Sequence, residues 1–414
     1  MKKYIFIVPN VSNMGGAQMY VRNKVLFLRK QGWKVDVITA TRGEVIIEEL
    51  KEFNKSMPEL AFDIYLYSKK HQQNVLSQLT DWIRDDNYDE IVIESTCISE
   101  CSWAEAVAKM IKAKNLCYLL QEDNEILNSG IQDFFKFKHD RKELVGITEQ
   151  SLLAMFAPFS PLVKQESYWL PAYCNNVEAN IDHPLLHAID KSKYTHVIGT
   201  VSRLDKPFVL PILNDFCEYA KTWSQKKFLY LLIGGAPDNS TLESDIKALF
   251  AQKAPNVELI MVGYLFPVPI RLLELCDVFV TSAGSGWLCQ KSGVPTIAID
   301  CNDFKPIGIL NRTTNNALFR ADNEPPLDFH QLMNDVLVNN RFPRKESNYE
   351  SELPDFSEHM TFLENSAETQ EYYDMNSIQV ESSEDRKLKW ALSLIGPSNY
   401  LKLGVLKQNW KGGK

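Results

Sequence analysis

A short run of small residues lies where the chain could bind a charged ligand. It consists of Ser282, Ala283, Gly284, Ser285 and Gly286. The surrounding stretch 277–300 indicates strand, glycine loop, short helix and second strand, because apolar runs flank it on both sides. Such a loop presents backbone N–H groups and the positive end of a helix dipole, which suits phosphate. We therefore expect a phosphate-bearing ligand at 282–286; the alternative is that the glycines only shape the connection.

A second glycine pair, Gly15-Gly16, follows the strand predicted at 4–8 and precedes a helix from about Met19 to Gln31. The next apolar run, 33–39, completes a strand–helix–strand unit. Open α/β sheets bind ligands in the loops at the carboxyl ends of such strands. The glycine spacing differs from the dinucleotide pattern G-x-G-x-x-G, so a nicotinamide enzyme is not indicated.

The elements that must position these loops alternate along most of the chain. Strand-like and helical stretches with short connections predict a doubly wound parallel sheet, and the pattern starts again after a polar stretch at 176–194. We expect an α/β protein with two Rossmann-like domains, 1–175 and 195–345, facing across a cleft. The predicted strands beyond those named above are 62–68, 90–95, 116–120, 145–148 and 167–171 in the first domain, and 196–202, 228–235, 257–263 and 296–299 in the second. A helix is predicted around 43–53.

Bulk composition excludes several classes of protein. The net charge of −8 argues against a nucleic-acid binder, which calls for a clustered basic face. No apolar stretch approaches the length of a membrane span, so we expect a cytoplasmic protein. The spacings Cys97-x3-Cys101 and His183-x3-His187 lack a matching second pair nearby, and no metal site is predicted.

The carboxyl-terminal part differs in charge from the rest. Residues 346–385 hold twelve Asp or Glu and no Lys or Arg, which indicates a largely exposed acidic connector. From Arg386 to the end there are seven Lys or Arg and no acidic residue. Two interpretations are open for the tail 386–414. It packs back on the body as a helix, or its Leu/Trp-rich basic surface touches an anionic membrane or a partner.

Taken in order, these motifs resemble those of the GT-B glycosyltransferases, and within them the large family-four group of bacterial polysaccharide transferases that use nucleotide sugars. NMGGAQMYVRNKVLFLRKQGWKVDVIT looks like the opening of that family, and IGTVSRLDKP looks like the start of its second domain. NVELIMVGYL, CDVFVTSAGSG and SGVPTIAID look like the series that follows. The resemblance covers about residues 1–345.

The resemblance implies a diphosphate site. A sugar transferase must stabilise a departing nucleotide diphosphate, and fixed cations and N–H donors do so. Arg203 and Lys206 match the diphosphate-binding Arg and Lys of the family, and the loop 282–286 would supply backbone donors. Gly15 and Gly16 would let the first domain approach the donor phosphate or sugar. The implied donor is a nucleotide-diphosphate sugar, with no other cofactor and no metal.

The resemblance to the family is less complete at the residues that would contact the nucleotide base and the sugar. Gly263-Tyr264 matches the place where the family seats the nucleotide base, although an aromatic residue after a strand is also an ordinary core feature. The family's E-x7-E pair is missing, because Leu288 stands where the second glutamate belongs. Gln290 is a candidate for a contact to a sugar hydroxyl.

Three carboxylates are candidate catalytic residues by position. Glu94 ends the strand 90–95, and Glu122 and Asp123 follow the strand 116–120. An inverting transferase would use one of them to deprotonate the acceptor hydroxyl, whereas a retaining one, as in the family, relies more on the leaving diphosphate. The alternative for each is a hydrogen-bonded loop residue.

Two functions are therefore open. The first is a glycosyltransferase of hexosyl type, which transfers a sugar to a glycan or lipid-linked acceptor in bacterial surface polysaccharide synthesis. In this function the basic tail would touch the inner face of the plasma membrane. The second is a catalytically inactive GT-B partner or stabilising subunit, which the missing glutamates motivate. Nucleotide binding separates the two.

Overall fold

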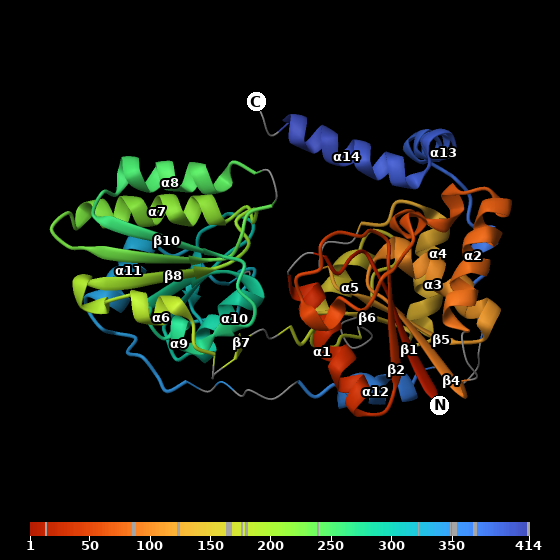
Figure 1. The fold of residues 1–414 in the computed structure, drawn as a ribbon, viewed down its shortest axis with the longest axis horizontal. Helices are drawn as coiled ribbons and strands as arrows, with labels where there is room; N and C mark the ends of the chain where they lie inside the picture. The colour runs from red at the N-terminus through yellow and green to blue at the C-terminus, as the bar shows by residue number, and fades with distance from the viewer. Residues whose placement is uncertain are drawn as a thin grey trace. The chain divides into compact units, whose positions relative to one another are not determined.

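A computed structural model gives the structure of the chain in two compact units, which are described separately (Figure 1). Unit 1 comprises Met1–Cys174 and Leu353–Lys414, and unit 2 comprises Asn175–Glu352. The described residues are 1–12, 15–84, 88–121, 125–162, 168–174, 177–178, 181–237, 240–321, 323–347, 349, 354–366 and 371–411.

The sheet of unit 1 is parallel and follows the order β3-β2-β1-β4-β5-β6. This is the strand order of the doubly wound dinucleotide-binding fold, in which the direction of winding reverses at the first strand. The reversal falls between β1 and β4, whose register places Ile7 beside Ser95. The strands are β1 Lys2–Val8, β2 Lys34–Thr39, β3 Lys55–Ser56, β4 Glu90–Ser95, β5 Lys114–Leu119 and β6 Leu144–Gly146.

Helices cover this sheet, and several begin at a side-chain cap that the sequence supplies. Ser68 accepts from His71 N at the start of α2, and Thr148 and Ser151 form a reciprocal capping box at α5. The helices of unit 1 before the linker are α1 Gly16–Lys30, α2 Lys69–Ile83, α3 Ile98–Ile111, α4 Ser129–Asp140 and α5 Glu149–Phe156.

Unit 2 repeats the same topology with a second sheet of order β10-β9-β8-β12-β13-β14, in which only β14 is antiparallel among the described strands. Its winding reverses between β8 and β12. A short β7-β11 ladder lies outside this sheet. The strands are β7 Val177–Glu178, β8 His196–Val201, β9 Phe228–Ile233, β10 Val257–Gly263, β11 Val268–Pro269, β12 Val278–Thr281, β13 Thr296–Ile299 and β14 Pro306–Ile309; the helices are α6 Pro184–Ala188, α7 Val209–Thr222, α8 Leu242–Lys253, α9 Ile270–Leu273, α10 Ala283–Lys291 and α11 Phe329–Leu337.

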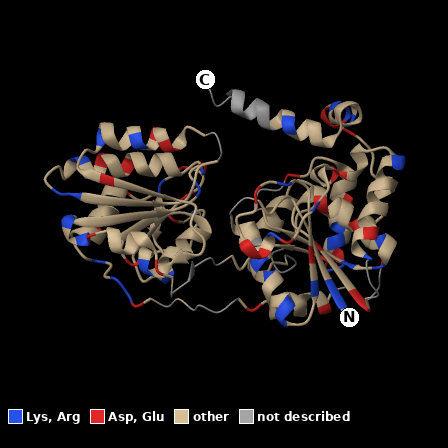
Figure 2. Cartoon of the chain, viewed as in Figure 1, with Lys and Arg blue, Asp and Glu red and all other residues tan. Residues whose placement is uncertain are grey.

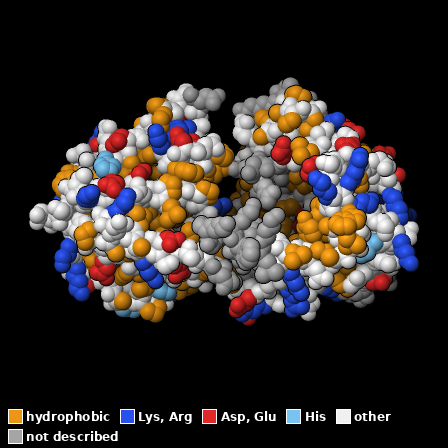
Figure 3. All heavy atoms as spheres, turned by 90° about the horizontal axis from the view of Figure 1, so that it is seen from above, with side chains coloured by type: hydrophobic (Ala, Val, Ile, Leu, Met, Phe, Trp, Pro, Cys, Tyr) orange, Lys and Arg blue, Asp and Glu red, His pale blue; other side chains and the backbone are white. Residues whose placement is uncertain are grey.

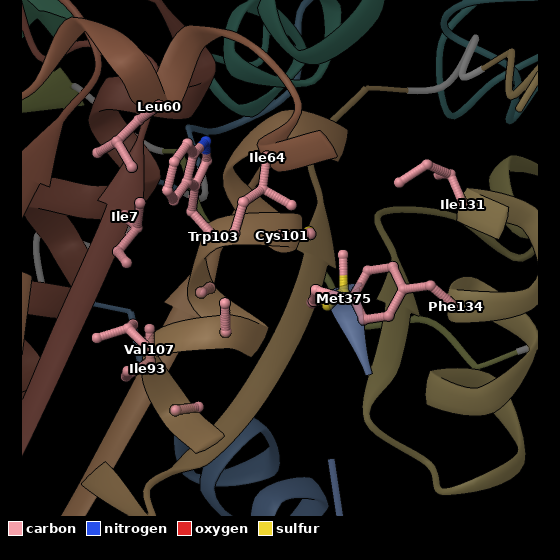
Figure 4. Packing of buried hydrophobic residues seen from close by; sticks show 14 of the residues in the cluster. Ile7, Leu60, Ile64, Ile93, Cys101, Trp103, Val107, Ile131, Phe134 and Met375 are labelled. Carbon is pink, nitrogen blue, oxygen red and sulfur yellow. The ribbon is translucent and has the colours of Figure 1, made fainter. Parts of the chain in front are cut away.

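The core of unit 1 lies between the sheet and the helices and includes residues from the end of the chain. Figure 4 shows Trp103 and Val107 of α3 beside strand residues, and Met375 beside Phe134 of α4. Trp103 has no exposed surface, and its indole N–H donates to Phe62 O at 2.8 Å. A buried indole therefore keeps its hydrogen bond, as close-packed cores require.

The carboxyl-terminal segment is part of unit 1, so the expectation of a largely exposed acidic connector is wrong for much of its length. Phe356, Leu363, Met375 and Ile378 are buried, and His359 has no exposed surface. Sparse apolar residues in an acidic stretch supply these contacts, while most of the Asp and Glu side chains that the structure describes there are exposed. The helices are α12 Ser357–Glu364, α13 Ser383–Ile395 and α14 Pro397–Lys411.

The tail packs on unit 1 through one face of α13. Leu392 is buried in the unit 1 core, and Tyr400 packs against Phe62 with ring centroids 5.6 Å apart. The outer face leaves Trp390 67% and Leu394 61% exposed. The packed-back interpretation therefore holds for α13, and an exposed apolar surface remains.

Two stretches of unit 1 adopt structures other than those predicted. The apolar run 62–68 forms a 3-10 turn, Ile64–Leu66, rather than a strand, and its carbonyls at Ile64 and Tyr67 accept from the Gln72 side chain. Within 43–53, where a helix was expected, the structure has only the 3-10 turn Glu48–Leu50. A short apolar run does not distinguish a strand from a buried turn.

Candidate functional site

The carboxyl ends of β8, β9 and β10 come together in unit 2 through close backbone contacts. Leu204 N donates to Gly235 O at 3.1 Å, and Gly234 N donates to Gly263 O at 3.0 Å. A Cβ on Gly234 would lie 1.7 Å from Ser202 O, and its φ is +148°, so only glycine fits there. The three strand ends consequently form one continuous edge.

The ring of Tyr264 lies on this edge. A Cβ on Gly235 would meet the ring at 2.3 Å, so the missing side chain lets Tyr264 lie against the backbone. The tyrosine remains 39% exposed. A flat aromatic surface held against a glycine backbone can stack on a planar ligand group. Gly263 itself has φ +75°, which favours glycine.

The run 282–286 is a helix N-terminus and not a loop, which corrects the predicted loop. Ser282 precedes α10 directly, and its hydroxyl donates to Ile299 O at 2.7 Å. Ala283 N donates to Ala317 O at 2.7 Å, and Ala283 has φ +56°. The Ser282 hydroxyl therefore fastens the turn internally, and α10 begins without a side-chain cap.

The glycines of this run differ in what surrounds them. Gly284 is exposed and Ser285 half-buried, whereas Gly286 is buried and a Cβ on it would meet Leu310 at 2.8 Å. Gly286 thus permits helix packing, while the backbone around Gly284 is open. Backbone N–H groups in the first turn of a helix lack helical partners and favour an anion.

Arg203 and Lys206 follow β8, and β12 pairs with β8. The Thr281 hydroxyl donates to Val201 O at 2.8 Å, which ties the two strand ends. The structure therefore brings Arg203 and the α10 N-terminus to one edge at the winding reversal, where open α/β sheets bind ligands. Arg203 Nε lies 3.1 Å from Asp205 Oδ1, and Lys206 is exposed.

Gln290 lies apart from the helix N-terminus. It is seven residues beyond Ala283, which places it about 10 Å along the axis at about 1.5 Å per residue. Leu288 packs against the core cluster of unit 2 that contains buried Cys289. The position of the family's second glutamate is thus an apolar packing position in this chain.

Gly15 and Gly16 lie in unit 1, where α1 begins without a side-chain cap. The Gln18 amide donates to Asn10 O and to Asn10 Oδ1, both at 3.2 Å, and holds the preceding loop. A Cβ on Gly16 would be 3.8 Å from Cys174 Sγ. The candidate residues Glu122 and Asp123 lie outside the described residues.

Glu94 is fully buried in unit 1 within a polar cluster that joins distant segments. Its carboxylate accepts from Lys24 Nζ at 2.5 Å, Tyr4 OH at 2.5 Å and Tyr20 OH at 2.6 Å. Lys24 Nζ also lies 3.3 Å from His359 Nδ1. Because that nitrogen must accept from the ammonium, His359 Nε2 carries the proton and donates to Pro171 O at 3.0 Å.

Burial sets the protonation of this cluster. Loss of water around the ammonium lowers the pKa of Lys24, and the Glu94 carboxylate opposes that effect. Burial, together with the Lys24 charge, lowers the pKa of His359 to about 2, so the ring is neutral. The Lys24–Glu94 pair, beside a neutral imidazole, joins α12 to α1 and β4. In this arrangement Glu94 has no exposed oxygen.

Charged side chains elsewhere are interspersed on both units (Figure 2). Within the parts of the chain that the structure describes, no group of three or more His, Cys, Asp or Glu is placed to hold a metal ion. Over the same residues, no helix combines the length and apolar character needed to cross a bilayer.

Comparison with known proteins identifies the fold. No protein-family model matches the sequence. No curated protein matches it either. Among solved structures, a glycosyltransferase from Rickettsia africae ESF-5 is similar with a TM-score of 0.56 and 16% identity, over 80% of this chain and 86% of that one. Anabaena HepE in complex with UDP and glucose is similar with a TM-score of 0.54 and 11% identity, over 94% of this chain and 99% of that one.

These likenesses, together with the two sheets, establish the class of fold. The chain is an α/β protein with two Rossmann-like domains and has the fold of the GT-B glycosyltransferases. At such low identity the comparison concerns the fold alone.

Two features of the candidate site were not predicted from the sequence. Gly234-Gly235 shape the edge beside Arg203, and the signal was an apolar strand ending directly in two glycines. Asp205 pairs with Arg203 and holds its guanidinium along the edge, and the signal was an acidic residue two positions after a candidate phosphate ligand.

Proposed function

We propose that this chain is a nucleotide-sugar-dependent glycosyltransferase. The observation that carries the proposal is the carboxyl edge of the unit 2 sheet, which carries Arg203, the uncapped start of α10 and the Tyr264 ring. A guanidinium and a helix N-terminus would stabilise the charge that develops on a departing diphosphate. The exposed tyrosine ring would stack on the nucleotide base.

The reaction would break the bond between the anomeric carbon and the β-phosphate oxygen of the donor and form a bond from that carbon to an acceptor oxygen. The acceptor proton would pass to the departing diphosphate in a retaining reaction of hexosyl type. In an inverting reaction, Glu122 or Asp123 would take it. Glu94 would have to leave its buried cluster to do so.

The solved structure of HepE contains UDP and glucose, so UDP is the first nucleotide to test. We expect calorimetric titration to give binding of UDP, GDP or TDP, or of their sugars. Replacing Arg203 with alanine should weaken binding at least about tenfold, because a charge-assisted hydrogen bond is worth about 1.5–3 kcal/mol. The variant Lys206→Ala should weaken it less.

The matched control is Arg271→Ala, which removes an exposed arginine of α9. It should leave nucleotide affinity unchanged. If no nucleotide gives heat of binding, the enzyme hypothesis is rejected and an inactive GT-B partner is favoured. The apolar packing of Leu288 favours that second function, because no carboxylate stands there to bind a sugar or ribose hydroxyl.

We further propose a glycan or lipid-linked acceptor of bacterial surface polysaccharide synthesis and a cytoplasmic protein that touches the inner face of the plasma membrane. The support is the exposed face of α13. Figure 3, viewed from the side on which this helix lies in Figure 1, shows hydrophobic side chains beside Lys and Arg on unit 1. Exposed Trp390 and Leu394 on α13, together with exposed Lys387 on the same helix, suit an anionic lipid surface.

A further inference from the structure

A pocket of about 260 Å³ opens at the carboxyl ends of β1 and β2 in unit 1. Three segments line it: one after β1, one at the end of β2 and beyond, and one after the turn Glu48–Leu50. The lining residues are Val11, Ser12, Thr39, Thr41, Arg42, Gly43, Val45, Lys51, Phe53 and Asn54. Carboxyl ends of parallel strands are the ligand-binding edge of this fold. None of the candidate residues discussed above lines the pocket.

The walls are held by contacts between the two strand-end loops. Thr41 N and Thr41 Oγ1 both donate to Pro9 O, at 2.9 and 3.2 Å, so the loop after β2 follows the segment after β1. A Cβ on Gly43 would lie 3.0 Å from Ser12 Cβ and Oγ. Ser12 and Gly43 thus lie close together in the polar wall of the pocket, and a side chain at position 43 would press against Ser12.

One positive charge of the pocket has no partner among the residues that the structure describes. Arg42 is exposed and makes no hydrogen bond or ion pair with any residue that the structure describes. The other lining cation, Lys51, lies 2.5 Å from Glu48 Oε2. None of the described lining residues is acidic. The neighbouring Glu52 is paired with Arg29 outside the lining.

The remaining walls suit a sugar. The Phe53 ring lines the pocket, and the Arg29 guanidinium lies 5.3 Å from the centre of that ring. Ser12, Thr41 and Asn54 add hydroxyl and amide groups. The volume of about 260 Å³ is just below the roughly 300–1,000 Å³ of pockets that bury a drug-sized ligand, which suits a ligand of the size of one monosaccharide.

We propose that this pocket binds one anionic sugar, a monosaccharide unit that carries a carboxylate or a phosphate, as part of the acceptor. The assignment of this sugar to the acceptor rests on the proposed function, whereas the binding of an anionic sugar rests on the pocket alone. The guanidinium of Arg42 would hold the anion in a bidentate pair, which an ammonium cannot do. Phe53 would face the apolar side of the ring, and Ser12 and Asn54 would bind its hydroxyls.

The test is ligand-observed NMR titration of the intact chain with four probes: glucuronate, glucose 1-phosphate, glucose and inorganic phosphate. We expect glucuronate or glucose 1-phosphate to bind at least about tenfold more tightly than glucose and than phosphate, since one charge-assisted hydrogen bond is worth that factor. Whichever binds identifies the anion as carboxylate or phosphate. Equal affinity for glucose and both anionic sugars, or phosphate binding as tightly as glucose 1-phosphate, overturns the proposal.

Two variants place the binding in this pocket. Arg42→Ala should abolish the preference for the anionic sugar, whereas Arg271→Ala, which also removes an exposed arginine, should keep it. Gly43→Val should weaken the binding of every sugar probe, because the new side chain points at Ser12. The backbone at Gly43 lies outside the left-handed region, so the substitution does not strain it. Unchanged affinity within twofold in both Arg42→Ala and Gly43→Val overturns the assignment.

UDP titration of the same samples separates this proposal from the proposed function. Arg42→Ala should bind UDP as the unaltered chain does, because the donor edge belongs to unit 2. A chain that binds the anionic sugar through Arg42 but binds no nucleotide refutes the donor site and leaves the pocket. A chain that binds UDP but shows no preference for an anionic sugar refutes the pocket alone.

Discussion

Removing one charge of the buried pair Lys24–Glu94 should destabilise unit 1 strongly. The variant Lys24→Met leaves a carboxylate with no exposed surface and only two tyrosine hydroxyls to donate to it. An uncompensated buried charge costs about 3–5 kcal/mol. That is a large part of the roughly 5–15 kcal/mol by which domains are stable. At the exposed pair Lys136–Asp133, Lys136→Met should cost less than about 1 kcal/mol.

The double variant Lys24→Met/Glu94→Gln should be more stable than the sum of the single changes predicts. Both charges are gone, and the Gln amide can still hydrogen-bond the hydroxyls of Tyr4 and Tyr20. We expect a coupling energy of about 1–3 kcal/mol in the double-mutant cycle. Urea unfolding gives these energies, and hydrogen exchange in the peptide that covers β4 assigns the transition to unit 1.

Additive effects would refute the reasoning. If the double variant equals the sum of the single variants within about 0.5 kcal/mol, the two groups do not interact as the 2.5 Å contact implies. A second outcome bears on catalysis. If Glu94→Gln stops sugar transfer while the free energy of unfolding is unchanged, Glu94 acts in the reaction and not in the buried cluster.

Three further predictions concern other parts of the molecule. Burial raises the pKa of Glu100 to about 8 in the folded chain, above its unfolded value. The contribution of Glu100 to stability therefore falls as pH rises from about 4.5 to about 8. In urea unfolding, Glu100→Gln should be a few kcal/mol more stable than the unaltered chain at pH 9 and should lose that advantage near pH 4. Gly234→Ala should cost about 3 kcal/mol or more in unit 2, whereas Gly404→Ala, with nothing within 4 Å, should be neutral or slightly stabilising in thermal unfolding. Trp390→Ala/Leu394→Ala should reduce pelleting with anionic liposomes without lowering the melting temperature, and unchanged pelleting would contradict the membrane contact.

Local pattern was sufficient to predict the architecture. The alternation of apolar runs and helical stretches indicated two doubly wound sheets, and both sheets have that strand order. Strands predicted at 196–202, 257–263 and 296–299 agree with β8, β10 and β13 to within a residue. All three are runs rich in β-branched and aliphatic residues; β8 and β13 are buried, whereas the edge strand β10 is partly exposed and ends at Gly263.

Features that depend on distant segments were not predictable in the same way. The contacts of Lys24 with Glu94 and His359 join residues 70 and 335 positions apart, and no local spacing reveals them. The acidic stretch 346–385 was predicted to be exposed from its charge, yet Met375 and Ile378 fill the core of unit 1. The overall composition of this stretch is dominated by its exposed carboxylates, so it does not reveal the few apolar side chains that pack in the core.

The candidate site was predicted in part. Arg203 and the start of α10 were predicted to share a ligand-binding edge, and the pairing of β8 with β12 brings them to one edge. The glycine run was assigned to a loop, because glycine usually interrupts helices. Here Gly286 lies inside α10, where its missing side chain admits Leu310.

The most direct test of the central claim is hydrogen–deuterium exchange of the intact chain with and without saturating UDP. If the donor diphosphate binds where we propose, exchange should slow at the N–H groups of Gly284, Ser285 and Gly286, and at Gly235 beside the Tyr264 ring. The remainder of unit 2 should change little. Unchanged exchange at 282–286 while calorimetry shows UDP bound would contradict the account.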